Sequence, residues 1–215
     1  MEPSPRFTPA RVAVVGLGYV GLPLSLQFCR SGLTVLGLDV DAQKVDALNN
    51  GRSYIRHIPT TAIAEASHSG RFRANTDFAQ LTDCDSVVIC VPTPLNRNRE
   101  PDLSFVLNTG QSIAPHLRRG MLVVLESTSY PGTTDEALRE VLEKGSGMAA
   151  GRDFHLAFSP EREDPGNPDS DVATIPKIVG GFTPECAECA RALYSRAVKT
   201  VVPVSSCRAA EAAKL

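Results

Sequence analysis

Apolar and polar positions of this 215-residue chain form two alternating kinds of segment from Arg11 onward. Short continuous apolar runs, typical of buried strands, alternate with stretches that carry apolar residues at helical spacing. Strands are expected at residues 11–16, 33–39, 71–74, 86–91, 121–126, 154–158 and 199–204. Helices are expected at residues 20–31, 42–50, 103–117, 133–144 and 184–195. This alternation predicts repeated βαβ units, and therefore a doubly wound α/β fold with a parallel sheet and helices on both faces.

Both ends of the chain depart from the alternation. The first ten residues hold three prolines and no periodicity, so we expect a mobile lead-in over residues 1–10. The main domain is expected to cover residues 11–205. Ser206 then precedes an Ala-rich helix of only about two and a half turns with no carboxy-terminal cap, which we interpret as the start of a truncated longer helix over 206–215.

Composition and charge narrow the function classes. The chain is 42% hydrophobic, and its 22 basic side chains nearly balance 24 acidic ones without a long run of one sign. Neither a nucleic-acid track nor a polybasic membrane patch is therefore expected. The apolar run of residues 12–28 is interrupted by three glycines and a proline, which argues against a secretory signal and against a membrane span of about 20 residues. We expect a soluble, cytoplasmic protein.

Six cysteines are scattered along the chain without the paired spacings of a zinc site. Cys186 and Cys189 form a lone C-x-x-C inside a predicted helix. This motif is compatible with metal or redox chemistry, but thiols packed on or near the surface of a helix are the favoured interpretation. No metal site is expected.

The first strand–helix junction carries the clearest chemical motif. Residues 16–21 (GLGYVG) follow an apolar strand and open a helix, and Asp39 stands 18 residues after the last glycine at a strand end. In such a motif Gly16 permits a tight turn, Gly18 lets the backbone approach a pyrophosphate, and Gly21 lets the helix pack closely on its strand. The amino terminus of the helix stabilises the phosphate charge.

The acid on the second strand identifies the nucleotide. Asp39 is expected to accept hydrogen bonds from the adenosine ribose hydroxyls and to repel the extra phosphate of NADP, so NAD is the expected cofactor. The alternative, a glycine-rich turn that binds nothing, explains the glycines but not the acid at this distance. The residues expected to bind the cofactor through this motif are Gly16, Gly18, Tyr19, Val20, Gly21 and Asp39.

Five segments, in order along the chain, resemble the UDP-glucose and GDP-mannose dehydrogenase family. They are VAVVGLGYVGLPLSLQF, ICVPTPLN, ESTSYPGTT, FSPERE with PGN, and AAEAAKL. Together they span nearly the whole chain from Arg11 to Leu215. The segment SYIRHIP together with SPERE is most similar to the branch that oxidises UDP-N-acetylhexosamines to uronic acids.

The resemblance implies a reaction and a set of site residues. The family removes two hydrides in succession from the sugar C6 carbon, through an enzyme-held aldehyde and a cysteine thioester, and uses two NAD per sugar. By motif, Glu161 corresponds to the acid/base glutamate, Thr128 to the threonine that helps hold the catalytic water, and Lys214 to the lysine that stabilises oxyanions. Thr93 and Thr128 follow strands and are expected beside NAD. The alternatives are a turn residue for Glu161, a solvated charge for Lys214, and a loop-shaping role for Thr93.

One departure from the family limits what this polypeptide is expected to do. The family's nucleophilic cysteine belongs to a glycine-rich motif downstream of Leu215, and neither Cys90 nor Cys207 matches it. The dimerising central helix and most of the sugar-binding domain also lie downstream. We therefore expect NAD binding without turnover from this chain, and a homodimer or higher oligomer acting on a UDP-sugar for the full-length enzyme.

Two other functions stay open at this point. A stand-alone NAD-binding module or pseudo-enzyme is favoured if the reading frame stops after Leu215. Another Rossmann dehydrogenase, of the 3-hydroxyacid or 6-phosphogluconate type, shares the first βαβ unit, but ESTSYPGTT and SPERE argue against it. For the chain alone we expect a monomer or a weak association.

Overall fold

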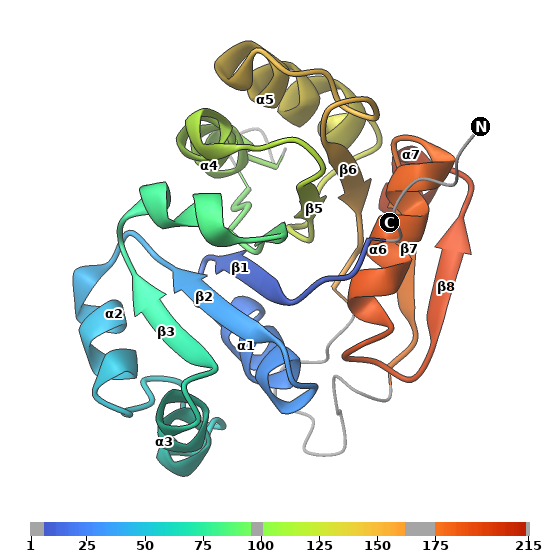
Figure 1. Ribbon diagram of the computed structural model, residues 1–215. Helices are drawn as coiled ribbons and strands as arrows, with labels where there is room; N and C mark the ends of the chain where they lie inside the picture. The colour runs from blue at the N-terminus through green and yellow to red at the C-terminus, as the bar shows by residue number, and fades with distance from the viewer. Residues whose placement is uncertain (1–6, 96–100, 162–174, 214–215) are drawn as a thin grey trace.

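The predicted apolar runs form a single sheet in the computed structural model, which describes residues 7–95, 101–161 and 175–213. Its strands lie in the order β3-β2-β1-β4-β5-β6-β7-β8 (Figure 1). Their bounds are β1 Arg11–Val15, β2 Thr34–Leu38, β3 Phe72–Asn75, β4 Ser86–Ile89, β5 Leu122–Leu125, β6 His155–Phe158, β7 Lys177–Gly181 and β8 Val201–Val204. The first six strands are parallel and confirm the doubly wound fold.

The far edge of the sheet corrects the expectation of a wholly parallel sheet. β7 runs antiparallel to β6, with Ala157 opposite Gly181 and Phe158 opposite Gly180, and β8 then pairs parallel with β7. Sequence patterning missed β7 because the strand begins with Lys177 and ends in two glycines, which are poor strand residues.

Helices connect the strands along the chain. The α-helices are α1 Gly21–Arg30, α2 Ala42–Asn49, α3 Thr60–His68, α4 Ser104–Ile113, α5 Arg139–Ser146, α6 Pro184–Tyr194 and α7 Cys207–Ala212. The helix expected at 103–117 is α4 followed by the 3-10 turn Ala114–His116, and the helix expected at 133–144 starts as the π-helical segment Thr133–Leu138 before α5. A further 3-10 helix covers Phe78–Asp83, and neither it nor α3 was expected.

The core forms one layer on each face of the sheet. Val12 and Val14 of β1 join the layer that includes buried side chains of α1, α2, α3 and α6. Ala13 and Val15 point the other way and join the layer formed with α4, α5 and α7. Because successive strand residues point to opposite faces, one continuous apolar strand can serve both layers. Helices therefore cover both faces, as predicted.

The two ends of the described chain both contact the domain. Phe7 packs edge-on against the ring of His155, with 6.4 Å between ring centroids, and the Ala10 amide donates to Asp85. Residues 1–6 lie outside the described residues, so a mobile lead-in stays a prediction there. Ser206 caps α7 by accepting a hydrogen bond from the Ala209 amide, as expected from the sequence. Among the described residues, no helix combines the length and the apolar character needed to cross a membrane.

Candidate functional site

Two glycines of the first loop are required by the packing of the protein itself. Gly16 has a φ of 91°, and its amide donates to the Leu38 carbonyl at 2.7 Å. A Cβ added to Gly21 would lie 1.9 Å from the Gly16 carbonyl oxygen, and one added to Gly16 would lie 2.6 Å from that of Cys90. The turn is therefore closed against β4, and α1 begins in direct contact with it.

Gly18 differs, because a Cβ there would meet nothing within 4 Å. The backbone at this position borders open space rather than protein. Just beyond it, α1 begins with no side-chain cap and no acidic residue in its first turn. The positive end of the helix dipole is thus uncompensated by the chain and is suited to an anion. Tyr19 is 62% exposed and stacks on the ring of His57.

Asp39 follows β2 and is attached to the glycine loop. One carboxylate oxygen accepts a hydrogen bond from the Leu17 amide at 2.9 Å, and the other accepts from the Asp41 amide at 3.0 Å. The carboxylate is 7% exposed, and the Lys44 ammonium lies 3.6 Å from it. Tyr54 donates its hydroxyl to the Leu17 carbonyl, which fixes the loop from the other side.

A pocket of about 300 Å³ lies at the carboxyl ends of β1, β4, β5 and β6. The strand order reverses between β1 and β4, which is where open α/β sheets bind ligands. The predicted site residues that the structure brings together in its wall are Gly18, Tyr19, Val20, Thr93, Thr128 and Glu161. The rest of the wall consists of Cys90, Val91, Pro92, Glu126 and Ser127. Gly16, Gly21 and Asp39 lie outside the wall and shape the adjacent loop.

The loops that carry the two predicted threonines are joined. Ser127 donates its hydroxyl to the Val91 carbonyl at 2.7 Å, which ties the loop after β5 to the loop after β4. Thr128 is exposed and Thr93 is half-buried, and both line the pocket. Lys214, the other predicted catalytic residue, lies outside the described residues.

Sequence analysis missed a buried ionic cluster beneath this pocket. The Lys177 ammonium lies 2.9 Å from a carboxylate oxygen of Glu126 and 2.9 Å from one of Glu161. Tyr194 of α6 donates its hydroxyl to the second oxygen of Glu126. We call these four residues, Glu126, Glu161, Lys177 and Tyr194, the ionic cluster.

Burial and charge set the ionisation of the cluster. Burial raises the pKa of Glu126 to about 7, against the opposing effect of the Lys177 charge. Burial alone would lower the pKa of Lys177, but the two carboxylates reverse this effect and raise it, so the ammonium stays charged. For Glu126 and Lys177 the sequence gives only a charged residue at the end of an apolar run, whereas Glu161 was singled out by the SPERE motif.

The cysteines show no metal site. No group of three or more His, Cys, Asp or Glu side chains is placed to hold a metal ion within the described ranges. Burial raises the pKa of Cys90 and of Cys207, so neither thiol is activated as a nucleophile. Cys186 and Cys189 lie in α6 as expected, but both are buried rather than at the helix surface.

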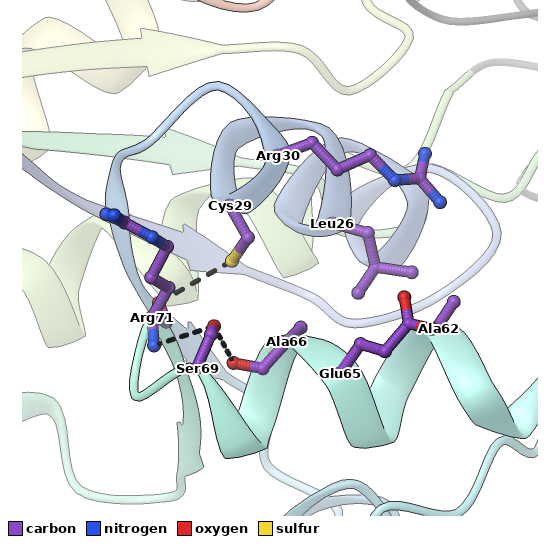
Figure 2. A pocket seen from close by; sticks show the side chains of 8 residues that line it. All are labelled: Leu26, Cys29, Arg30, Ala62, Glu65, Ala66, Ser69 and Arg71. Carbon is purple, nitrogen blue, oxygen red and sulfur yellow. Dashed lines mark hydrogen bonds between the residues drawn. The ribbon is translucent and has the colours of Figure 1, made fainter.

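A second pocket, between α1 and α3, contains no predicted site residue. Figure 2 shows Leu26 and Cys29 of α1 facing Ala62 and Ala66 of α3 across it. The Cys29 thiol in its wall already donates to the Arg71 carbonyl. Burial also raises the pKa of Cys29 to about 12. We therefore take the pocket at the carboxyl edge of the sheet as the candidate site.

Comparison with known proteins gives a consistent result. Residues 10–198 match the family model described as UDP-glucose/GDP-mannose dehydrogenase family, NAD binding domain. The chain is 38% identical to the UDP-N-acetyl-D-glucosamine 6-dehydrogenase of Pseudomonas aeruginosa, over 95% of this chain and 48% of that protein. It is 34% identical to the UDP-N-acetyl-D-mannosamine dehydrogenase of Pyrococcus horikoshii, over 95% of this chain and 49% of that protein.

A solved structure extends the comparison to the fold. The crystal structure of the NDP-N-acetyl-D-galactosaminuronic acid dehydrogenase from Methanosarcina mazei Go1 superposes with a TM-score of 0.91 at 32% identity. The match covers 97% of this chain and 46% of that one. The chain thus spans about half the length of the relatives it matches.

Proposed function

The chain belongs to the UDP-glucose/GDP-mannose dehydrogenase family through its NAD-binding domain, and from that premise we propose that it is the cofactor half of a UDP-sugar dehydrogenase. The reaction we propose is the four-electron oxidation of the C6 alcohol of a UDP-N-acetylhexosamine to the uronate. The observation that carries the proposal is the single pocket in which the glycine loop, both threonines and Glu161 meet.

The residues present fit NAD. Gly18 leaves room for close approach of a phosphate, and the uncapped start of α1 offers amide groups and a positive dipole to it. The Asp39 carboxylate, fixed beside the loop by the Leu17 amide, has lone pairs left for ribose hydroxyls. When bound, NAD supplies the acceptor for the hydride.

We propose that Glu161 transfers protons in the reaction. It lies in the pocket wall, and its carboxylate is held by Lys177 at 2.9 Å. A carboxylate placed in this way can take a proton from a sugar hydroxyl or from a water molecule. Thr128, in the same wall, is proposed to orient that water, and Lys214 to stabilise the oxyanion.

Turnover is proposed to require an activated thiolate in the candidate pocket, which the cysteine of its wall, Cys90, does not provide. The pKa of the Cys90 thiol, in the pocket wall, is raised by burial. A protonated thiol is a poor nucleophile, so thioester formation at this position is disfavoured. The sugar and a second subunit are proposed to bind through the other half of the full-length enzyme, the half of the relatives that this chain does not match.

Calorimetric titration with NAD and with NADP tests the cofactor assignment. We expect NAD to bind in preference to NADP, and the matched variant Asp39→Ser to lose most of that preference. Binding of neither nucleotide, or equal binding of both to the wild type, would contradict the assignment.

The same sample, mixed with UDP-N-acetylglucosamine, tests the chemistry. We expect no NADH from this chain alone, and NADH from a full-length enzyme that contains it. Accumulation of NADH with the chain alone would mean that one of its own thiols acts. Reduction of NAD by a 3-hydroxyacid but not by a UDP-sugar in the full-length enzyme would assign the protein to another dehydrogenase class.

A further inference from the structure

Cys186, Cys189 and His155 form a second cluster of reactive groups that the proposed function does not use. Cys186 and Cys189 stand one helical turn apart near the start of α6, and His155 is the first residue of β6. The carboxyl end of β6 leads to Glu161 and the NAD pocket, so this cluster lies toward the opposite edge of the sheet. We call the three residues the dithiol cluster.

The Cys186 sulfur is surrounded by donors suited to a thiolate. The Leu156 amide donates to it at 3.4 Å and the Thr183 hydroxyl at 3.1 Å, and the Nδ1 atom of His155 lies 3.9 Å away. Thr183 also caps α6, so the sulfur lies at the positive end of that helix. The two donors, the imidazole and the helix amino terminus all favour the thiolate form of Cys186.

The charges agree with this geometry. Burial raises the pKa of Cys186, but the hydrogen bonds from His155 and Thr183 outweigh it and lower the pKa below its ordinary value. The contacts with Cys186 and Cys189 raise the pKa of His155 to about 10. Both shifts favour the charged forms, a thiolate at Cys186 and an imidazolium at His155.

Two members of the cluster border the surface: Cys189 is 5% exposed and His155 is half-buried. Cys189 and His155 line a broad groove of about 1190 Å³, whose wall also contains Arg119, Arg152 and Arg191. Each guanidinium is paired with a carboxylate, Arg119 and Arg152 with Asp153 and Arg191 with Glu188, so the groove carries both signs of charge and suits a small zwitterionic peptide disulfide. Cys186 is fully buried and does not line the groove, so Cys189 is the entry thiol and Cys186 the internal one.

We propose that Cys186 and Cys189 are a reversible dithiol–disulfide pair that exchanges with low-molecular-weight disulfides at this groove. Residues three apart on a helix have Cβ atoms about 5–6 Å apart, and a disulfide needs about 3.8 Å. The first turns of α6 must therefore tighten to form the bond, which makes the bond easy to reduce again.

The exchange balances in two steps. The Cys189 thiol loses its proton as its sulfur attacks one sulfur of the oxidant; the oxidant's S–S bond breaks, a mixed disulfide forms, and the leaving sulfur takes up a proton and departs as a thiol. The Cys186 thiolate then attacks the Cys189 sulfur, which forms the intramolecular bond and releases the second thiol. The two protein thiols lose two electrons, the oxidant disulfide gains them, and the two protons leave on the released thiols.

Peptide mapping after incubation with oxidised glutathione tests the proposal on the chain as it stands. Trypsin places both cysteines in one peptide, residues 178–191, and places the buried pair Cys84 and Cys90 in another, residues 74–97. We expect the 178–191 peptide to lose two hydrogens and to resist alkylation, and dithiothreitol to reverse both changes. The 74–97 peptide is the internal control and should remain fully alkylated after denaturation.

A matched variant tests the part played by His155. His155→Phe keeps an aromatic ring against Phe7 but removes the ring nitrogen, and we expect it to slow oxidation of the 178–191 peptide about tenfold or more. Two results would overturn the proposal. One is a wild-type 178–191 peptide that stays doubly alkylated in excess oxidant, and the other is equal oxidation rates in wild type and variant. Because no nucleotide is used, the outcome does not depend on whether the chain binds NAD.

Discussion

Replacing Lys177 with methionine removes the ammonium group from between two carboxylates and leaves the volume of the side chain nearly unchanged. The lysine side chain is 6% exposed and Glu126 is fully buried, so water cannot replace the lost charge. Breaking a buried ion pair by removing one partner costs about 3–5 kcal/mol. Since single domains are stabilised by about 5–15 kcal/mol in total, we expect Lys177→Met to remove a large part of the stability at pH 8.

The loss should depend on pH with a defined sign. In the wild type Glu126 has a folded pKa of about 7, above its ordinary value of 4.5. A carboxyl whose pKa is raised by folding stabilises the fold fully below 4.5, and this contribution disappears as pH rises through 7. Without Lys177 the folded pKa rises further, so the variant loses stability more steeply with pH. The difference between wild type and variant is therefore expected to be smaller at pH 5 than at pH 8.

Urea unfolding followed by circular dichroism measures these differences. The second variant, Lys177→Met with Glu126→Gln, replaces the unpaired carboxylate with a neutral amide and should recover at least half of the loss at pH 8. A loss under about 1 kcal/mol at pH 8 would refute the reasoning. So would an equal loss at both pH values, or no recovery in the double variant.

Three further predictions concern packing and the cofactor. Gly21→Ala would place a methyl group 1.9 Å from the Gly16 carbonyl oxygen, so we expect a loss of more than about 2 kcal/mol, measured by urea unfolding. In Gly18→Ala the added methyl group meets no neighbour, so the free energy of unfolding should change by less than about 1 kcal/mol. Calorimetry should nevertheless show weaker NAD binding, and unchanged affinity would contradict the loop assignment. Glu211→Ala removes the acceptor of three hydrogen bonds, from the Gly132 and Thr134 amides and the Thr134 hydroxyl. We expect the free energy of unfolding to fall by about 2 kcal/mol or more, and the amides of α7 to exchange faster. Unaltered exchange would show that this contact does not dock the helix.

The strands and the cofactor loop were predictable because their signals are local. Runs such as residues 12–15 are apolar throughout, and no other element accommodates them as well as a strand buried on both faces. The predicted pocket residues follow different strands, and parallel strands bring such residues to one edge of a sheet. Their proximity therefore follows from the fold class alone.

The missed features depend on contacts far apart in the sequence. α3 buries only Ile63 and Ala66, which is too small an apolar stripe to stand out. Fifty-one positions separate Glu126 from Lys177, and no local pattern shows that they are in contact. Thirty-one positions separate His155 from Cys186, so the sequence does not show that the C-x-x-C motif lies beside a histidine.

The reversed direction of β7 brings the Lys177 ammonium to the carboxylate of Glu161 in the wall of the candidate pocket. Continuing the antiparallel register from the Phe158–Gly180 pair by three positions sets Glu161 opposite Lys177. A β7 parallel to β6 would begin at the other edge of the sheet and carry this lysine roughly 13 Å away. The change of chain direction thus starts β7 at the edge where β1 to β6 end, and it lets two residues on either side of one connection form a charge pair.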